Sequence, residues 1–98
     1  MKSSNSFRAE LRLLPTDEGG RHTGVGSGSW LILDFRLDPG LGLFGARIEI
    51  DKGDWIEPGQ SCTATLTPLV TVPAELHVGR PFDLWDGRVV GSGMVLPA

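Results

Sequence analysis

The segment that most constrains the fold is Phe7–Leu13, in which apolar and charged residues alternate without a break. Four apolar residues occupy every second position, and two arginines and a glutamate stand between them. A period of two gives a β-strand one apolar face, whereas an amphipathic helix requires a period of 3.6. The segment therefore predicts a half-buried strand, which Pro15 ends. Helical periodicity is found nowhere over a useful length, so an all-β fold is expected.

Five more strand-like runs follow, at residues 30–37, 46–50, 61–66, 81–85 and 88–96. The run from Trp30 to Leu37 is apolar nearly throughout, so we expect both of its faces to be covered at one end. Turn residues separate the runs, and Asp86-Gly87 predicts a tight two-residue hairpin. Six short strands separated by turns indicate a small antiparallel barrel or sandwich.

The size and charge of the chain limit its class. With 98 residues there is room for one domain, predicted over residues 7–98, behind a short polar tail, residues 1–6, that we expect to be disordered. The formal net charge of −3 excludes a domain that is basic overall, so any binding of nucleic acid must rest on a local patch.

Cysteine and hydrophobicity limit the chemistry and the compartment. Cys62 is the single cysteine, so no internal disulfide forms, and with only His22 and His77 beside it a Cys-rich zinc site is excluded. A lone thiol suits a reducing cytoplasm, where we expect the protein to reside. No apolar run approaches the ~18 residues of a membrane span, and the tail lacks the apolar stretch of a signal peptide. We expect no metal, no cofactor and no membrane association.

Patterns that carry enzyme chemistry have simpler explanations here. The segment Gly40–Gly45 matches G-x-G-x-x-G, but it precedes a predicted strand where a dinucleotide site needs a helix, so a loop is expected. His22 has no nucleophile near it in sequence. The carboxylate pairs fall at turns, where aspartate is common: Asp51 with Asp54, and Asp83 with Asp86. An enzyme is the least favoured class, and no catalytic residue is predicted.

The polar loop from Thr16 to Gly28 holds Arg21-His22-Thr23 among several glycines. Together with Arg88 and Arg36, these residues can form a small anion-binding face, because backbone N–H groups and arginine side chains both suit phosphate. The alternative is a solvated loop on an acidic protein.

Three segments form a pattern in chain order. They are Glu18-Gly19-Gly20-Arg21-His22-Thr23, Glu57-Pro58-Gly59, and the final hairpin from Asp86 to Val95. They resemble Glu-Gly-Gly-Arg-His-Thr-Pro, Met-Pro-Gly and Glu-Gly-Gly-Arg-Thr-Val-Gly-Ala-Gly-Val-Val in the C-terminal β-barrel domain of the elongation factor Tu group of translation GTPases. The resemblance runs from about Phe7 to Leu96. It departs from the family at Gly24, which replaces a proline, at the final turn, which is one residue shorter, and at a polar strip replaced by Trp30-Leu31-Ile32-Leu33.

The resemblance implies a six-stranded antiparallel β-barrel of that family's type, here as a stand-alone domain without the GTPase domain. In the family this barrel performs no chemistry. It helps to hold the T-stem backbone of aminoacyl-tRNA, touches the exchange factor and closes against the GTPase domain. Three loop residues and the hairpin keep family-like positions: Arg21, His22, Thr23, Asp86, Gly87 and Arg88.

Two functions from different classes follow. The first is a non-enzymatic module that binds another protein, or a second copy of itself, through Trp30, Leu31, Ile32 and Leu33, and the resemblance implies a role linked to translation. Four consecutive apolar residues form a partner surface if they are exposed, and core if they are not. The second is binding of RNA resembling tRNA through Arg21, His22 and Arg88. The orientation of Trp30 and Ile32, and whether the arginines share a face, distinguish them.

Overall fold

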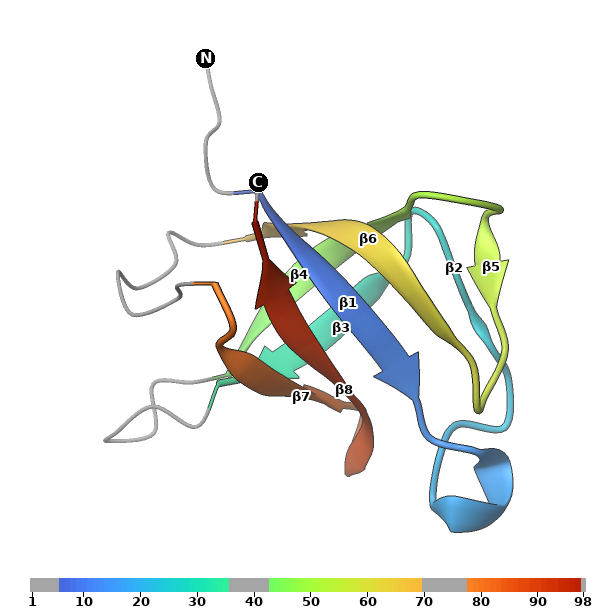
Figure 1. Ribbon diagram of the computed structural model, residues 1–98. Coiled ribbons are helices and arrows are strands. Elements are labelled where there is room, and N and C mark those ends of the chain that lie inside the picture. The colour runs from blue at the N-terminus through green and yellow to red at the C-terminus, as the bar shows by residue number, and fades with distance from the viewer. Residues whose placement is uncertain (1–5, 36–42, 70–77, 98) are drawn as a thin grey trace.

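Six antiparallel strands close into a barrel in the computed structural model, which describes residues 6–35, 43–69 and 78–97. Their order around the ring is β1-β6-β4-β3-β7-β8, and β8 pairs back onto β1 (Figure 1). The prediction of an all-β, six-stranded antiparallel barrel is confirmed. The strands are β1 (Phe7–Leu13), β3 (Trp30–Asp34), β4 (Leu43–Ile50), β6 (Ser61–Pro68), β7 (Pro81–Trp85) and β8 (Val89–Leu96).

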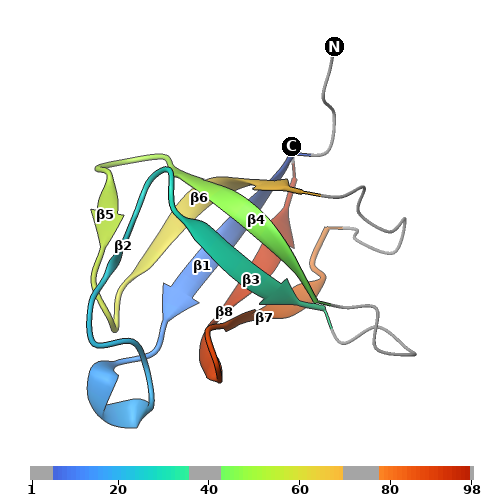
Figure 2. The same cartoon turned by 180° about the vertical axis from the view of Figure 1, so that it is seen from behind.

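The expected loop from Thr16 to Gly28 contains short regular elements, which corrects the prediction. A 3-10 turn, η1 (Thr16–Glu18), is followed by β2 (Val25–Gly26), which pairs with β5 (Trp55–Ile56) in a separate two-stranded ribbon (Figure 2). Val25 and Ile56 lie opposite each other and are both buried in the core. The ribbon forms because these two apolar side chains cover the end of the barrel at which β1 finishes.

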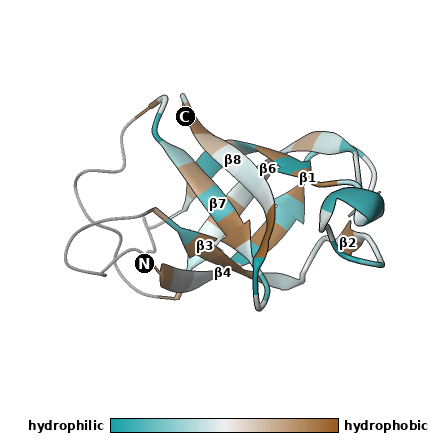
Figure 3. Cartoon of the chain, turned by 90° about the horizontal axis from the view of Figure 1, so that it is seen from below, coloured by the Kyte–Doolittle hydropathy of each residue, from teal (hydrophilic) through white to brown (hydrophobic). Residues whose placement is uncertain are grey.

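The interior is filled by the apolar residues of the alternating strands, and hydropathy alternates visibly along them in Figure 3. Among the described residues no polar or charged side chain is buried. At the end where β1 begins, the rings of Phe7, Phe35 and Phe82 pack together, with centroids 4.8–6.3 Å apart. The buried set is Ala9, Leu11, Leu13, Val25, Leu31, Leu33, Phe35, Ala46, Ile48, Ile50, Ile56, Ala64, Leu66, Phe82, Leu84, Val90 and Val95.

Strand β4 begins earlier than predicted, at Leu43 instead of Ala46. Leu43–Gly45, the second half of the G-x-G-x-x-G match, was expected to be a loop, and that expectation is wrong. These residues pair with β3, where Gly45 lies opposite Ile32, because the backbone hydrogen bonds of β3 need a partner along its whole length. The first half of the match, with the turn at 38–40, lies outside the described residues.

The final hairpin also differs from the prediction. Three residues, Asp86–Arg88, separate β7 from β8 where two were expected, and the register shifts between Leu84 and Trp85. Gly87 adopts a left-handed backbone with φ of 74°, as its place in a tight turn requires. The shift leaves Trp85 opposite Val89 and turns the Arg88 side chain toward the loop after β1.

Two smaller expectations concern the termini and the membrane. Of the predicted tail only Ser6 is described, and its hydroxyl shares a hydrogen bond of 2.8 Å with that of Thr67 on β6. In the part of the chain that the structure describes, no helix has the length and apolar character needed to cross a membrane.

Candidate functional site

The run Trp30–Leu33 lies on β3 and divides between the two faces of the sheet. Leu31 and Leu33 point into the barrel and are 5% and 0% exposed, whereas Trp30 and Ile32 point outward and are 54% and 38% exposed. The prediction of a four-residue surface strip is therefore wrong for Leu31 and Leu33, and only Trp30 and Ile32 lie on the surface. The outer side of β3 is uncovered at Trp30 and Ile32, whereas Asp34 further along the strand is half-buried. Coverage of both faces at the far end stays a prediction, because residues 36 and 37 lie outside the described residues.

Apolar residues of neighbouring strands surround Ile32 on the outside of the barrel. Ile32 lies opposite Gly45 on β4 and Trp85 on β7, and Trp85 in turn lies opposite the exposed Val89. Leu69 donates its backbone N–H to the Gly45 carbonyl at 3.0 Å and is itself 69% exposed. We call this surface the Ile32 face and define it by Trp30, Ile32, Leu43, Gly45, Leu69, Trp85 and Val89.

The sequence analysis missed most of the Ile32 face. Trp85 has the outward parity of its strand, since Phe82 and Leu84 point inward, so alternation could have found it. Leu43 and Leu69 lie at strand ends, where no local pattern fixes their direction.

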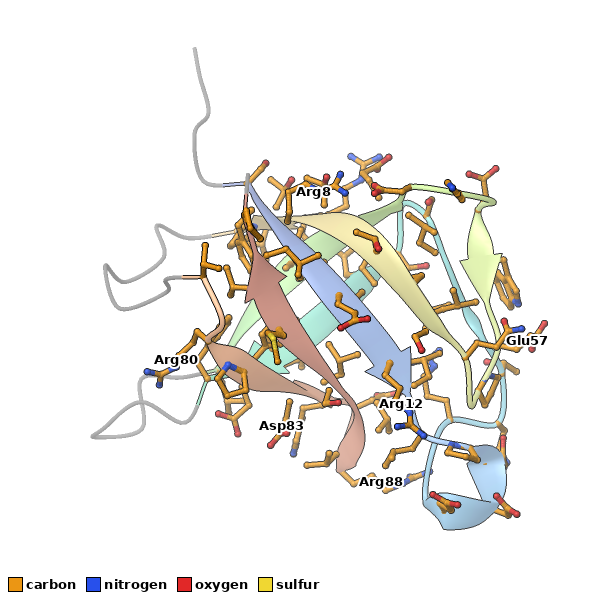
Figure 4. The ribbon with its side chains drawn as sticks, in the orientation of Figure 1. Arg8, Arg12, Glu57, Arg80, Asp83 and Arg88 are labelled. Carbon is orange, nitrogen blue, oxygen red and sulfur yellow. The ribbon has the colours of Figure 1, made fainter. Side chains whose placement is uncertain are left out.

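The predicted loop and hairpin residues do come together. Arg88 donates from Nε to the Gly19 carbonyl at 2.8 Å and from Nη2 to the Gly20 carbonyl at 3.0 Å. Figure 4 shows its side chain reaching from the hairpin toward η1. Arg21 donates from Nη1 to Oδ2 of Asp86 at 2.9 Å. Arg21, His22 and Arg88 therefore share one face, as the RNA hypothesis requires.

These residues line a small open hollow of about 260 Å³, with Thr23 and Val90 at its edge. Most of its cationic groups already have partners within the protein. The Nε of Arg21 donates to the Thr23 carbonyl at 3.3 Å, in addition to the ion pair with Asp86. We call this set the arginine brace (Arg21, Asp86 and Arg88), because its hydrogen bonds join the hairpin to the loop after β1.

Arg88→Ala should lower the free energy of unfolding by about 1–3 kcal/mol, since it removes two hydrogen bonds and leaves the carbonyl of the buried Gly20 without its donor. Urea unfolding measures the loss. Arg12→Ala is the matched control: Arg12 is exposed on β1, and its side chain makes no hydrogen bond or ion pair with the described residues. Equal stability of the two variants would show that the brace contributes nothing.

Two of the carboxylates considered for catalysis form ion pairs within the protein. Asp51 forms a bidentate ion pair with Arg8, Asp86 belongs to the brace, and Asp83 lies opposite Asp34 on the outer face. His22 is exposed at the rim of the hollow. Within residues 6–35, 43–69 and 78–97, no group of three or more histidine, cysteine or acidic side chains has the geometry for a metal ion. His77 and Arg36 lie outside those ranges.

A larger hollow, of about 700 Å³, lies between β5 and the start of β6. Trp55 and Cys62 line it, and the indole N–H of Trp55 donates to Oε2 of Glu57 at 2.7 Å. Burial, assisted by the negative charge of Asp51, raises the pKa of the Cys62 thiol above its ordinary value. This microenvironment disfavours the thiolate, the reactive form.

Alkylation of Cys62 by iodoacetamide should therefore be slower in the folded protein than in the same chain unfolded in urea. Because the folded-state pKa is raised, the thiolate fraction at any given pH is lower, and the curve of rate against pH shifts to higher pH. Mass spectrometry of reactions quenched at set times, over a series of pH values, measures the alkylation rates of the folded and the unfolded chain. If the alkylation rate of the folded protein rose at the same pH as that of the unfolded chain, or at a lower pH, the raised pKa of Cys62 would be contradicted.

The outer face of β3 and the arginine brace are thus the two surfaces on which the sequence-predicted residues gather. Compared with models of known protein families, the sequence matches none.

Proposed function

We propose that this chain is a non-enzymatic protein-binding domain that receives its partner on the Ile32 face. The observation that carries the proposal is the outward exposure of Trp30 and Ile32, at 54% and 38%. Core packing explains Leu31 and Leu33 on the same strand, but it leaves these two side chains in water. Monomeric soluble proteins rarely expose a cluster of large apolar side chains on one face, and where such a cluster occurs it marks an interaction surface.

The composition of the face supports a protein partner. It combines two tryptophans with aliphatic side chains, and aromatic residues are enriched at the centres of protein interfaces. Gly45 contributes no side chain to the outer surface, and the Leu69 side chain lies over it, since a Cβ at Gly45 would stand 3.3 Å from Cδ1 of Leu69. A partner that covers this surface removes the exposed Ile32 and Leu69 side chains from water together.

Ile32→Lys should weaken partner binding by at least about 30-fold, since a charge at the centre of an apolar interface costs about 2 kcal/mol or more. Asp34 and Asp83 lie two residues further along the strands and on the same face, so the lysine has acidic neighbours and the barrel should fold. Met94→Lys is the control, because Met94 is 44% exposed on the outer side of β8 and lies opposite Glu10 and Pro81.

The measurement is capture of proteins from cell extract on the immobilised wild type and the two variants, after circular dichroism has shown that all three are folded. Supporting the proposal requires partners that bind the wild type and Met94→Lys but not Ile32→Lys. The motif resemblance to the elongation factor Tu barrel makes translation proteins the first candidates to test. Identical capture by all three proteins would refute the proposal, as would a wild type that binds neither another protein nor itself.

Binding of an RNA such as tRNA is the second candidate, favoured by the placement of Arg21, His22 and Arg88 around one hollow. It predicts an affinity that falls steeply with salt, by a slope of about −0.7 to −0.9 per phosphate neutralised. Filter binding of tRNA at low and moderate salt, with Arg21→Ala against Arg12→Ala, measures this. This candidate ranks second because Arg21 and Arg88 are already hydrogen-bonded within the protein. A failure to detect tRNA binding at low salt would eliminate it.

A further inference from the structure

The indole of Trp55 forms a flat platform on the β2–β5 ribbon. Trp55 lies opposite Gly26, and its ring lies across the backbone of Gly24 and Gly26. A Cβ on Gly24 would stand 2.6 Å from the indole Nε1, and one on Gly26 would stand 3.0 Å from Cε3. Because neither residue has a side chain, one face of the ring packs directly on the backbone of β2. Trp55 is still 52% exposed, so the other face of the ring meets water.

The carboxylate of Glu57 holds the edge of this ring. The indole N–H of Trp55 donates to Oε2 of Glu57 at 2.7 Å, and Figure 4 shows Glu57 at the end of β5. The bond fixes the orientation of the ring and leaves Oε1 able to accept further hydrogen bonds, since a carboxylate has about four acceptor positions. Within residues 6–35, 43–69 and 78–97, no cationic side chain pairs with Glu57, so its charge is not neutralised there.

An open sheet edge forms one wall of the 700 Å³ hollow that Trp55 lines. Strand β6 pairs with β1 from Ser61 onward but with β4 only from Ala64 onward, and β5 diverges from it (Figures 1 and 2). The Thr63 carbonyl accepts the N–H of Asp51 at 3.0 Å. Residues two apart in a strand point their backbone groups the same way, so those of Ser61 point into the hollow, where no described residue bonds to them. An extended peptide can pair with them.

We propose that Trp55 and Glu57 bind an arginine side chain of a partner protein, presented by an extended segment whose backbone lies in the hollow. A guanidinium group is planar, stacks on aromatic faces and donates a fork of hydrogen bonds to a carboxylate. One such group therefore meets both the free face of the indole and Oε1 of Glu57. The site is separate from the Ile32 face, and the inference goes beyond the proposed function.

The charges around the platform favour arginine over other groups that stack on tryptophan. Asp51 is paired with Arg8, so the unpaired charges of the segment are those of Lys52, Asp54 and Glu57, one positive and two negative. A nucleic-acid base also stacks on indole, but it brings phosphates that this negative segment repels. A lysine ammonium has the required charge, but it is strongly hydrated and has no flat face to lie on the ring.

Nuclear magnetic resonance of the isotope-labelled protein tests the site with the blocked peptide acetyl-Gly-Gly-Arg-Gly-Gly-amide. Each of the 3 tryptophans has an indole N–H signal, and that of Trp55 is assigned by its loss in Trp55→Phe. The Trp55 indole signal and the Ser61 amide signal should shift with a Kd of about 1 mM, as expected for one exposed cation–π contact assisted by a carboxylate. The indole signals of Trp30 and Trp85 should stay in place.

Two changes separate charge from stacking. A peptide with citrulline in place of arginine keeps the flat shape without the charge and should bind at least about fivefold more weakly. Glu57→Gln keeps an oxygen for the indole N–H but removes the charge, so it should weaken binding of the arginine peptide about threefold and leave the citrulline peptide unaffected. Glu10→Gln makes the same change on β1 and should bind as the wild type does.

A preference for arginine over citrulline that is reduced in Glu57→Gln and kept in Glu10→Gln supports the proposal. Equal binding of the two peptides to the wild type overturns it, and this comparison needs no substituted protein to fold. The proposal also fails if the Trp55 signal stays in place at several times the expected Kd, or if it moves with a short oligonucleotide but not with the arginine peptide.

Ile32→Lys should bind the arginine peptide as the wild type does, because Ile32 does not line the hollow. The two proposals can therefore fail separately. Loss of protein capture with Ile32→Lys tests the Ile32 face, whereas the peptide titration tests only Trp55 and Glu57.

Discussion

Gly91→Ala should destabilise the domain by about 3 kcal/mol, at the upper end of what overpacking costs. Gly91 lies opposite Leu13 where β8 meets β1, the seam that closes the ring. A Cβ there would overlap the carbonyl oxygen of Arg12 and stand 3.0 Å from Cδ1 of Leu84. The oxygen belongs to the backbone and cannot turn aside, so relief requires β8 to move away from β1.

Gly45→Ala is the control for the seam variant. Its added methyl group would meet Cδ1 of Leu69 at 3.3 Å, the far end of a flexible and exposed side chain. The cost there should be below about 1 kcal/mol, because alanine also loses less backbone entropy than glycine on folding. Urea unfolding of both variants, at a concentration too low for self-association, measures the difference. Equal stabilities would show that the β1–β8 seam does not hold the barrel closed.

Leu33→Ala should cost about 2–5 kcal/mol, whereas Ile32→Ala should cost less than about 1 kcal/mol. The two residues are adjacent in sequence and similar in size, but Leu33 is 0% exposed inside the barrel and Ile32 is 38% exposed outside. Removal of the buried side chain leaves a cavity among Leu84 and the other core residues, and the remaining packing closes it only in part.

Thermal unfolding of the two alanine variants at low protein concentration separates these costs. The more stable variant, Ile32→Ala, should retain the fold but lose partner binding, which capture from cell extract reports. If Ile32→Ala proved as unstable as Leu33→Ala, then β3 would be buried on both faces, as its continuous apolar run suggests. That outcome would remove the docking face on which the proposed function depends.

Much of the fold follows from local patterns. Phe7–Leu13 alternates strictly, and the structure buries Ala9, Leu11 and Leu13 as the pattern requires. The turn at Glu57-Pro58-Gly59 is also where the sequence places it, with a φ of 90° at Gly59 and a hydrogen bond from Gln60 N–H to the Glu57 carbonyl. These features depend on near neighbours, so a single sequence contains the information for them.

The candidate sites were less accessible to sequence reasoning. Trp30–Leu33 contains only apolar residues, so it has no alternation from which to assign an inner and an outer side. The loop residue Arg21 and the hairpin residue Asp86 are 65 positions apart, and nothing between them indicates an ion pair. The grouping of Arg21 with Arg88 was inferred from shared charge, but the carbonyl partners of Arg88 were not.

Local residue patterns are sufficient to predict the six strands of the barrel, because a side chain's direction in a strand is set by its own parity and the turns by their own residues. The folded chain is needed to show which strands are neighbours and which half of Trp30–Leu33 meets water. Those outcomes depend on pairing between segments distant in the chain, which is fixed when the closed ring buries its core as one unit.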